Sequence, residues 1–497
     1  MKCLLIIPAW NERDLFPDKL ATSARHLWQP LGILYVGAQL LRDGHEVKFI
    51  DGALHTHTEI IDTFSSEAPD FVGIYSNMPI WNVTKRTIED IKKLSPRTFI
   101  SVGGPTAIGW RQRCLVECPD LDCVHTGEGE TSAPGVVEYL QGKRTLASVP
   151  GIIYRDEDRE IRVNPDAPPI KELDRIAFPA RHLLEDVNKY RPILSSFRKL
   201  PVFTIFSSRG CTHRCLFCFQ AEKARGVRFR SAVNVVDEIE HSIERLGARE
   251  FKFLDDLFTI NHPRVFEICK EIKRRRLDFP WFVSGRVDTV NKRLLATMRD
   301  AGCYGILFGV ESGVQKSLDS LRKGQTVDQI RRAVKDARSV GMKINTPFIF
   351  GIPGETYEDG LQTIKFALEL NADIANFHTL APYPGTELYD HVDRYGVMSE
   401  SVEDYTFEAA GFVPYTMTRE QVLRLKQLAF KKFYRRPRYM VQQLLKVRSR
   451  YEFQALWEGL LSLGRLYFNP DMFIGHAALK RRFKGDPIMS SLLPKKD

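Results

Sequence analysis

The sequence lacks the features of three common classes of protein. No apolar run approaches the roughly 18 residues that a membrane-spanning helix needs. Its nine cysteines are odd in number and irregularly spaced, unlike the disulfide framework of a small secreted domain. No motif resembles those that read RNA or DNA, so nucleic acid is not an expected partner. These absences favour an ordinary globular protein of the reducing cytoplasm.

The phosphate-binding motif of NAD enzymes is missing too. Such domains carry Gly-x-Gly-x-x-Gly directly after their first strand. Here the apolar run 3–9 continues into PAWNERD, which holds no glycine. The opening MKCLLIIPAW is short for a signal peptide and is followed by charged residues, so we expect a first strand there. NAD is therefore disfavoured.

What is present is an average composition with uneven charge. The 497 residues are 43% hydrophobic and 27% charged, with a formal net charge of +10. The stretch KKFYRRPRYMVQQLLKVRSR (431–450) holds lysines and arginines but no acid. We interpret it first as the solvated face of a helix. Alternatively, this basic helix could lie on an anionic membrane surface, or it could contact a hydrophobic or anionic substrate.

Short apolar runs alternate with helical patterns over the first 140 residues. This pattern is typical of a parallel sheet covered by helices on both faces, that is, a Rossmann-like α/β domain. Ligands of such sheets bind beyond the carboxyl ends of the strands. The expected strands are 3–9, 46–53, 71–77, 97–105 and 123–129.

A second alternation predicts an open, partial (β/α)6 barrel. Residues 141–200 contain two short strand patterns and a proline-rich linker, and the alternation resumes at 201–415. Six strands are fewer than the eight of a closed barrel, in which the chemistry sits at the carboxyl ends of the strands. Residues 416–497 read as a C-terminal helical domain. The expected barrel strands are 202–208, 250–256, 281–288, 304–311, 343–351 and 374–384.

The chemically distinctive residues of this second part follow its strands. Three cysteines come after the first, Asp255 and Asp256 after the second, and Arg286 lies on the third. Glu311 follows the fourth, and the turn GIPGE (351–355) follows the fifth. Asp255 and Asp256 could instead cap a helix, and Glu311 could pair with a basic residue. Their common place at strand ends favours one site.

The motif RGCTHRCLFCF (209–219) spaces its cysteines as CxxxCxxC. A structural zinc site takes four ligands, and His213 is poorly placed to supply the fourth. A redox CxxC would need a thioredoxin-like context, which is absent. A [4Fe–4S] cluster takes thiolates, and three of them leave one iron with an exchangeable position. Cys211, Cys215 and Cys218 are therefore the predicted ligands of such a cluster.

This motif, after the first strand of a partial barrel, resembles that of the radical S-adenosylmethionine (radical SAM) superfamily. The resemblance implies that the open iron binds SAM, which is cleaved reductively to a 5′-deoxyadenosyl radical. It also implies an electron donor such as flavodoxin or ferredoxin. GVESG (309–313), FIFGIPGET (348–356) and APYPGT (381–386) resemble other SAM-contacting segments. The implied SAM-binding residues are Phe217, Asp255, Asp256, Arg286, Glu311, Gly351 and Pro384.

The N-terminal part resembles the cobalamin-binding domain of the B12-dependent class of that superfamily. The resemblance rests on residues 29–51, FVGIYSN (71–77), VGGP (102–105), HTGEGE (125–130) and the linker ending FPAR (178–181). In it, Ser76, Asn77, Gly103 and Gly104 flank the nucleotide tail, where small residues permit close approach. The implied cobalamin contacts are Pro30, Leu31, Gly32, Ser76, Asn77, Gly103, Gly104, Pro105, Gly127, Glu128 and Gly129.

One departure concerns the axial histidine of many other cobalamin proteins. Its DxHxxG motif is missing after the first strand, and His55 and His57 are better read as capping or exposed residues. A degenerate domain without cobalamin therefore stays open. The resemblance implies methyl transfer to an unactivated carbon (or phosphorus) of a small-molecule biosynthetic intermediate. The alternatives are radical cyclisation, rearrangement or dehydration, and a non-catalytic metal-binding protein.

Overall fold

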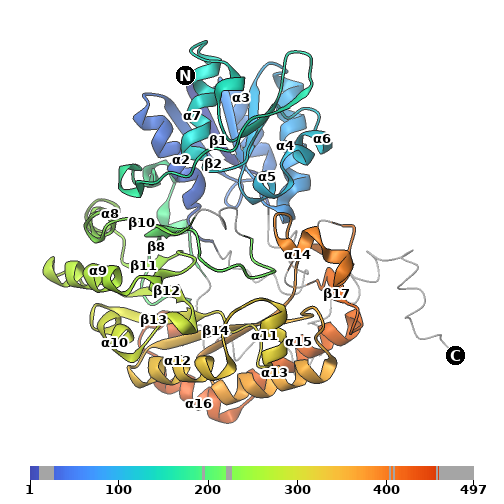
Figure 1. The fold of residues 1–497 in the computed structure, drawn as a ribbon. Coiled ribbons are helices and arrows are strands. Elements are labelled where there is room, and N and C mark those ends of the chain that lie inside the picture. The colour runs from blue at the N-terminus through green and yellow to red at the C-terminus, as the bar shows by residue number, and fades with distance from the viewer. Residues whose placement is uncertain are drawn as a thin grey trace.

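Two parallel sheets, each with its own helices, make up most of the protein. The computed structural model describes residues 1–10, 27–192, 196–219, 226–401, 404–406, 409–454 and 457. The predicted helical region from 416 is described only in its first part, and 458–497 lie outside the described residues. Figure 1 shows the first sheet with its helices at the top and the barrel below it.

The first sheet has seven strands in the order β2-β1-β3-β4-β5-β6-β7. β1 to β5 run parallel, as the apolar runs predict, and their buried side chains occupy both faces. The strands are β1 (Lys2–Ile7), β2 (Glu46–Asp51), β3 (Phe71–Tyr75), β4 (Phe99–Gly103), β5 (Cys123–His125), β6 (Ile152–Arg155) and β7 (Ile161–Val163).

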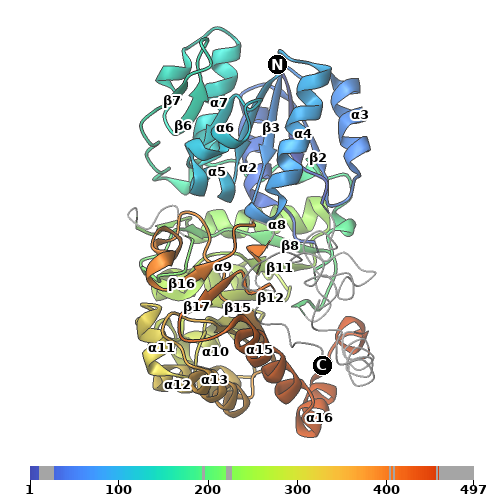
Figure 2. The same cartoon turned by 90° about the vertical axis from the view of Figure 1, so that its right-hand side faces the viewer.

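Helices cover both faces of this sheet and form two hydrophobic clusters. One cluster contains Trp81 and Ile88 on one face, and the other contains Ile33 and Val136 on the opposite face. Figure 2 shows the helices around the sheet. They are α2 (Leu31–Arg42), α3 (His57–Glu67), α4 (Trp81–Leu94), α5 (Pro105–Trp110), α6 (Gln112–Glu117) and α7 (Gly129–Leu140).

The two strands expected between the domains extend the first sheet instead of standing apart from it. β6 pairs antiparallel with β5, and β7 pairs antiparallel with β6. Their apolar side chains complete the edge of the sheet, because Ile152, Ile153 and Tyr154 are all buried. A two-strand pattern in sequence does not reveal that its partner is a strand some 30 residues earlier.

The barrel sheet has six parallel strands in the order β15-β14-β13-β12-β11-β8, which confirms the predicted partial barrel. A short antiparallel hairpin follows β8, made by β9 (Ser208–Arg209) and β10 (Arg228–Phe229). The barrel strands are β8 (Val202–Ile205), β11 (Glu250–Phe253), β12 (Trp281–Gly285), β13 (Cys303–Phe308), β14 (Lys343–Phe350) and β15 (Ile374–Thr379).

Helices pack against the outside of the barrel over one continuous core, which includes Trp281 and Phe253 with ring centroids 5.4 Å apart. A second small hairpin joins β16 (Gly396–Met398) to β17 (Phe412–Pro414). The helices are α8 (Ala232–Leu246), α9 (His262–Arg274), α10 (Lys292–Asp300), α11 (Gln315–Ser320), α12 (Val327–Ser339), α13 (Tyr357–Leu370), α14 (Glu387–Asp390), α15 (Arg419–Tyr434) and α16 (Pro437–Lys446).

A buried arginine of the linker ties the two sheets together. Arg181, the last residue of FPAR, is 2% exposed and forms an ion pair of 2.7 Å with Glu238 of α8. It also donates hydrogen bonds to the Thr204 carbonyl of β8 and to the Gln29 side chain before α2. The Arg181 side chain therefore contacts both the first sheet's domain and the barrel, and these contacts help to fix how the two sheets face each other.

Among the described residues, no helix is both long and apolar enough to cross a lipid bilayer.

Candidate functional site

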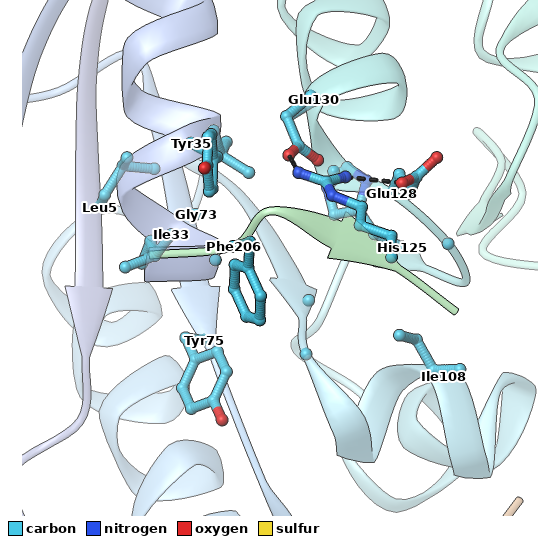
Figure 3. Close-up of a pocket in the computed structure, with 18 of the residues that line it drawn as sticks. Leu5, Ile33, Tyr35, Gly73, Tyr75, Ile108, His125, Glu128, Glu130 and Phe206 are labelled. Atoms are coloured by element: carbon cyan, nitrogen blue, oxygen red, sulfur yellow. Dashed lines mark hydrogen bonds and ion pairs between the residues drawn. The ribbon is translucent and has the colours of Figure 1, made fainter. Parts of the chain in front are cut away.

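A cavity lies where the carboxyl ends of the first sheet face the mouth of the barrel. This central cavity holds about 1420 Å³ of empty space, part of it open to solvent. Its lining includes Gly73, Tyr75 and Gly103 from the first sheet, and Cys211 and Asp256 from the barrel. Figure 3 shows residues of the first sheet and α2 around it. Both strand-end regions predicted to bind ligands thus open into one space.

Glycines of the first sheet leave room for a large ligand at this edge. Gly32, Gly103, Gly104, Gly127 and Gly129, all predicted cobalamin contacts, line the cavity. A Cβ atom at Gly32 or Gly127 would meet nothing within 4 Å. Gly104 has φ +95°, and a Cβ there would lie 2.7 Å from the Ser76 carbonyl oxygen, so a side chain is excluded. This wall fits a bulky cofactor held against backbone.

Other predicted cobalamin contacts do not line the central cavity. The Ser76 side chain is buried, and its hydroxyl is hydrogen-bonded to that of Thr84 at 2.9 Å. The Ser76 N–H donates to the Gly103 carbonyl, so this serine holds the loop after β3 to the loop after β4. The remaining residues that do not line the cavity are Pro30, Leu31, Asn77 and Pro105.

The carboxylate of Glu128 joins the first sheet to the barrel. It accepts hydrogen bonds from Arg209 at 2.6 Å, from Arg228 at 2.9 Å, and from the Ile170 N–H at 2.7 Å. Burial opposes the charge of Glu128, but the two arginines outweigh it and the pKa of Glu128 is lowered. Arg209 also pairs with Glu130 of α7 (Figure 3). Glu128 is a predicted cobalamin contact, yet its charge is balanced by the hairpin next to the cysteines.

The cysteine loop (Gly210–Phe219) begins directly after β9, between the two strands of that hairpin. Cys211 and Cys215 are buried, and Cys218 is partly exposed. Gly210 has φ +89°, and a Cβ there would lie 2.4 Å from the Gly226 carbonyl oxygen, so the sharp turn before Cys211 requires glycine. Leu216, within the loop, donates its N–H to the Leu321 carbonyl and accepts from the Leu388 N–H. The loop is thereby held over the barrel mouth.

The three thiols have the chemistry of a cluster site. No disulfide joins any of the nine cysteines, all of which lie in described residues. In the described part of the chain, no three His, Cys, Asp or Glu side chains converge as ligands of one metal ion would. A [4Fe–4S] cluster does not need such convergence, because each thiolate binds a different iron. The donor set fits an iron–sulfur cluster.

Asp255 and Asp256 occupy different environments. Asp255 is 2% exposed, and its carboxylate accepts hydrogen bonds from the Ser207 N–H at 2.7 Å, the Ser207 hydroxyl, and the Ser208 hydroxyl at 2.8 Å. It therefore anchors the chain just before the cysteine loop. Asp256 is exposed and lines the central cavity. The two adjacent carboxylates therefore differ: Asp255 anchors the chain, and Asp256, in the turn after β11, lines the cavity.

A charged network at the barrel mouth brings together three predicted SAM contacts. Arg286 forms a two-point ion pair with Asp288, at 2.9 and 2.8 Å, and donates to the Lys323 carbonyl. The Lys323 ammonium lies 2.8 Å from Glu311 and 5.8 Å from the centre of the Phe217 ring. Asp288 and Lys323 lie in no motif, so the sequence did not indicate them.

Glu311 itself adopts a strained backbone conformation. Its φ is +64°, a region that residues with a side chain rarely enter. Two hydrogen bonds hold it there: its N–H donates to the Pro347 carbonyl, and its carbonyl accepts from the Ile349 N–H. Strain of this kind concentrates at functional sites, where surrounding structure maintains it.

The last two predicted SAM contacts, Gly351 and Pro384, do not line the central cavity. Gly351 has φ +85° and donates its N–H to the Glu355 carboxylate at 2.7 Å. A Cβ on Gly109 of α5 would lie 2.4 Å from the Pro384 carbonyl oxygen, so this segment contacts the first sheet's helices closely.

Glu355 should give the protein a pH-dependent stability. Burial raises the pKa of Glu355 to about 8, despite hydrogen bonds from the Ile352 and Gly351 N–H groups. A carboxyl whose pKa is raised in the folded state stabilises it fully below the unfolded pKa, and this contribution is lost as pH rises through about 8. We expect Glu355→Gln to raise the melting temperature at pH 9 relative to the unaltered protein, and much less at pH 5. An equal shift at both pH values would contradict this assignment.

Comparisons with known proteins identify the class. Residues 205–367 match the radical SAM superfamily, and residues 17–137 match the B12 binding domain. An uncharacterized methyltransferase of Pyrococcus horikoshii is 32% identical over 90% of this chain and 95% of its own. An anaerobic magnesium-protoporphyrin IX monomethyl ester cyclase of Rubrivivax gelatinosus is 29% identical over 85% of this chain and 77% of its own.

A solved structure with the same fold is that of OxsB, a cobalamin-dependent S-adenosylmethionine radical enzyme with aqua-cobalamin and SAM bound. It covers 99% of this chain and 75% of its own, with a TM-score of 0.73 and 18% sequence identity. The likeness confirms the arrangement of a Rossmann-like sheet before a partial barrel.

The fold and the central cavity define an enzyme of the radical SAM class. The chain belongs, more particularly, to the family of radical SAM enzymes that carry a B12-binding domain. Its cofactors are a [4Fe–4S] cluster, SAM and cobalamin, as the motifs predict.

Proposed function

We propose that the protein is a cobalamin-dependent methyltransferase that acts on an unactivated carbon (or phosphorus) of a biosynthetic intermediate. The observation that carries this proposal is the shared cavity: Cys211 and Asp256 of the barrel line the same space as the glycines of the first sheet. When bound, the cluster with SAM supplies one-electron hydrogen abstraction, and cobalamin supplies a transferable methyl group. A single shared space allows both to reach one substrate atom.

The chain's own residues bind these groups and exclude water from them. Cys211, Cys215 and Cys218 hold the cluster, and two of them are already buried. Asp256 faces the cavity, where its carboxylate suits the amino group of SAM. The Arg209 link to Glu128 and Glu130 fixes the start of the cysteine loop against the first sheet. Alignment of this kind, with two of the thiols buried, limits side reactions.

The two aspartates offer a direct test of the SAM site. We expect Asp256→Asn to weaken SAM binding about tenfold, because it removes a charge-assisted hydrogen bond to the ligand, and to lower the melting temperature less than Asp255→Asn does. Asp255→Asn is the matched control, since it should lower the melting temperature by loosening Ser207 and Ser208. Calorimetric SAM titration and thermal unfolding measure both effects. Unchanged SAM affinity in Asp256→Asn would remove Asp256 from the site.

The electron comes from outside the chain in this proposal. A small reductant of the flavodoxin or ferredoxin type is the partner that this chemistry suits, because reductive cleavage of SAM consumes one electron. Cytoplasmic location remains a prediction from the cysteine usage.

A second candidate function is radical cyclisation, rearrangement or dehydration without methyl transfer. It is favoured by the Rubrivivax gelatinosus relative, which is named a cyclase and matches over 85% of this chain. The same cavity serves either reaction.

Product analysis separates the two candidates. Protein reconstituted anaerobically with iron, sulfide and cobalamin is supplied with SAM, a reductant and candidate substrates. Methyl transfer predicts both 5′-deoxyadenosine and S-adenosylhomocysteine. Deoxyadenosine without S-adenosylhomocysteine favours the second candidate, and absence of both from a cluster-loaded protein overturns the enzymatic proposal.

A further inference from the structure

Two buried polar atoms of the first sheet line the central cavity and have no hydrogen-bond partner among the described residues. They are the Oγ of Ser101 and the Nε2 of His125. Ser101 is 1% exposed and His125 is 5% exposed. A buried polar atom without a partner costs free energy, and native proteins hold few of them unless a ligand or water completes the bond. Both atoms therefore point to a polar ligand in this part of the cavity.

The two residues lie on the same face of the sheet, the one that α2 and α7 cover. Ser101 of β4 pairs with Gly73 of β3 and with Cys123 of β5. His125 lies two residues beyond Cys123, so Ser101 is about 7 Å deeper from the carboxyl edge than His125. Cys123 packs with Ile33 of α2 in the cluster on this face. The polar pair thus marks two depths of one slot between the sheet and its helices.

His125 is held in a defined orientation. Its Nδ1 is hydrogen-bonded to the Ser132 hydroxyl of α7 at 2.8 Å. Burial lowers the pKa of His125 to about 4, so the ring is neutral at ordinary pH. A neutral ring with Nδ1 engaged offers one hydrogen bond from Nε2, as donor or acceptor according to its tautomer. Beside it, a Cβ on Gly103 would contact only the His125 Cβ, at 3.9 Å, so space adjoins the ring.

The rest of the slot is apolar and suits a planar base. Leu5, Ile33, Val36, Phe71 and Ala133 line it between the sheet and the two helices. The apolar edge of such a base would pack against these side chains, while its free ring nitrogen, next to the sugar, faces Ser101 and the sugar itself lies nearer His125 and the mouth.

We propose that Ser101 and His125 bind the nucleotide tail of cobalamin, with the Ser101 hydroxyl donating to the base and the His125 Nε2 bonding the ribose. This rests on cobalamin as the cofactor of the first sheet. Neither residue was among the contacts that the motifs implied. Ser76 was among the implied contacts, but its hydroxyl is already hydrogen-bonded to that of Thr84.

Comparison of two corrinoids tests this contact directly. Cobinamide carries the corrin ring but lacks the nucleotide, so only cobalamin can use Ser101 and His125. We expect Ser101→Ala and His125→Phe each to weaken cobalamin binding about tenfold, the loss of one hydrogen bond in a buried site. Cobinamide binding should stay unchanged in both. Equilibrium titration of the full-length protein, followed by corrinoid absorbance, measures the four affinities.

Controls separate the contact from damage to the fold. Ser242→Ala makes the same change at a buried serine of α8 whose hydroxyl also has no partner in the described residues but which does not line the cavity. It should leave both affinities unchanged. His125→Gln retains a hydrogen-bonding group and should recover part of the loss seen with His125→Phe, and it serves as the test if His125→Phe does not fold.

Three outcomes would overturn the proposal. Equal weakening of cobalamin and cobinamide would mean that the substitutions only damage the pocket. Unchanged cobalamin affinity in Ser101→Ala and in both His125 variants would place the tail elsewhere while leaving cobalamin as the cofactor. If the unaltered protein bound neither corrinoid, the cofactor assignment would fail together with this proposal.

Discussion

Replacing Cys215 by alanine is expected to abolish both the iron–sulfur cluster and SAM cleavage. Three thiolates hold the cluster and leave one iron for SAM, so the loss of one thiolate removes the site that SAM requires. Reconstituted Cys215→Ala should therefore lack the iron–sulfur absorbance and the electron paramagnetic resonance signal of the reduced cluster. It should release no detectable 5′-deoxyadenosine. This is the largest effect on activity that we expect from a single substitution.

Cys269 provides the matched control for this experiment. It is a buried residue of α9 in the barrel core, and burial raises the pKa of its thiol to about 12, which disfavours a metal-binding thiolate. Cys269→Ala should load a full cluster and cleave SAM at the unaltered rate. A cluster of normal content in Cys215→Ala, or loss of the cluster in Cys269→Ala, would contradict the assignment of the ligands.

The largest effect on stability should come from Arg181. Its ion pair with Glu238 is almost wholly buried, with 1% and 0% of the two side chains exposed. We expect Arg181→Met to lower the free energy of unfolding by about 3–5 kcal/mol, because it leaves the Glu238 carboxylate buried with one partner fewer. Denaturant unfolding measures this loss. The substitution also removes the hydrogen bond to the Thr204 carbonyl, which belongs to the first barrel strand.

An exposed ion pair supplies the comparison. Arg331 pairs with Glu369 at 2.6 Å, but 45% and 53% of the two side chains are exposed to solvent. Arg331→Met should therefore change the free energy of unfolding by only about 0–1 kcal/mol. If the two variants were equally stable, burial of the Arg181 pair would not be the source of its contribution.

Acid should remove the same contribution in the unaltered protein. Burial disfavours the charge of Glu238, but Arg230 and Arg181 outweigh it, and the pKa of Glu238 is lowered in the folded state. A carboxyl with a lowered pKa stabilises the fold above its unfolded pKa of about 4.3, and this is lost as pH falls through the folded value. The difference in stability between the unaltered protein and Arg181→Met should accordingly shrink below about pH 4.

Local sequence was sufficient for the parts of the protein that depend on neighbours along the chain. The six strands of the barrel could be placed because each is a short apolar run, and each after the first comes after a helical pattern. The cysteine spacing indicated the cluster because three thiolates in one loop need no distant partner to be recognised. The glycines that wall the cavity were indicated by short motifs that resemble those of a known family, and these motifs are local too.

Ion pairs and hydrogen bonds between residues far apart in the sequence could not be predicted from local patterns. Glu128 lies in a glycine-rich loop that resembles a cobalamin contact, yet its carboxylate is bound by Arg209 and Arg228, 81 and 100 residues away. Lys323 forms an ion pair with Glu311, a predicted SAM contact, only because the fold brings the two residues together. Asp255 and Asp256 looked equivalent until hydrogen bonds to Ser207 and Ser208 separated them.

The sequence by itself determined the fold class, the two cofactor-binding regions and the ligands expected for the cluster. The fold class follows from periodicity and the cluster ligands from spacing, whereas the two cofactor-binding regions follow from the resemblance of short motifs to a known family; all of these signals act over a few residues. Only the tertiary structure decided that both regions open into one cavity, and that Asp256 rather than Asp255 lines it. It also revealed that the Ser101 Oγ and the His125 Nε2 are buried and have no hydrogen-bond partner among the described residues. The physical reason is that burial and pairing depend on what the folded chain brings together, and no local pattern records those contacts.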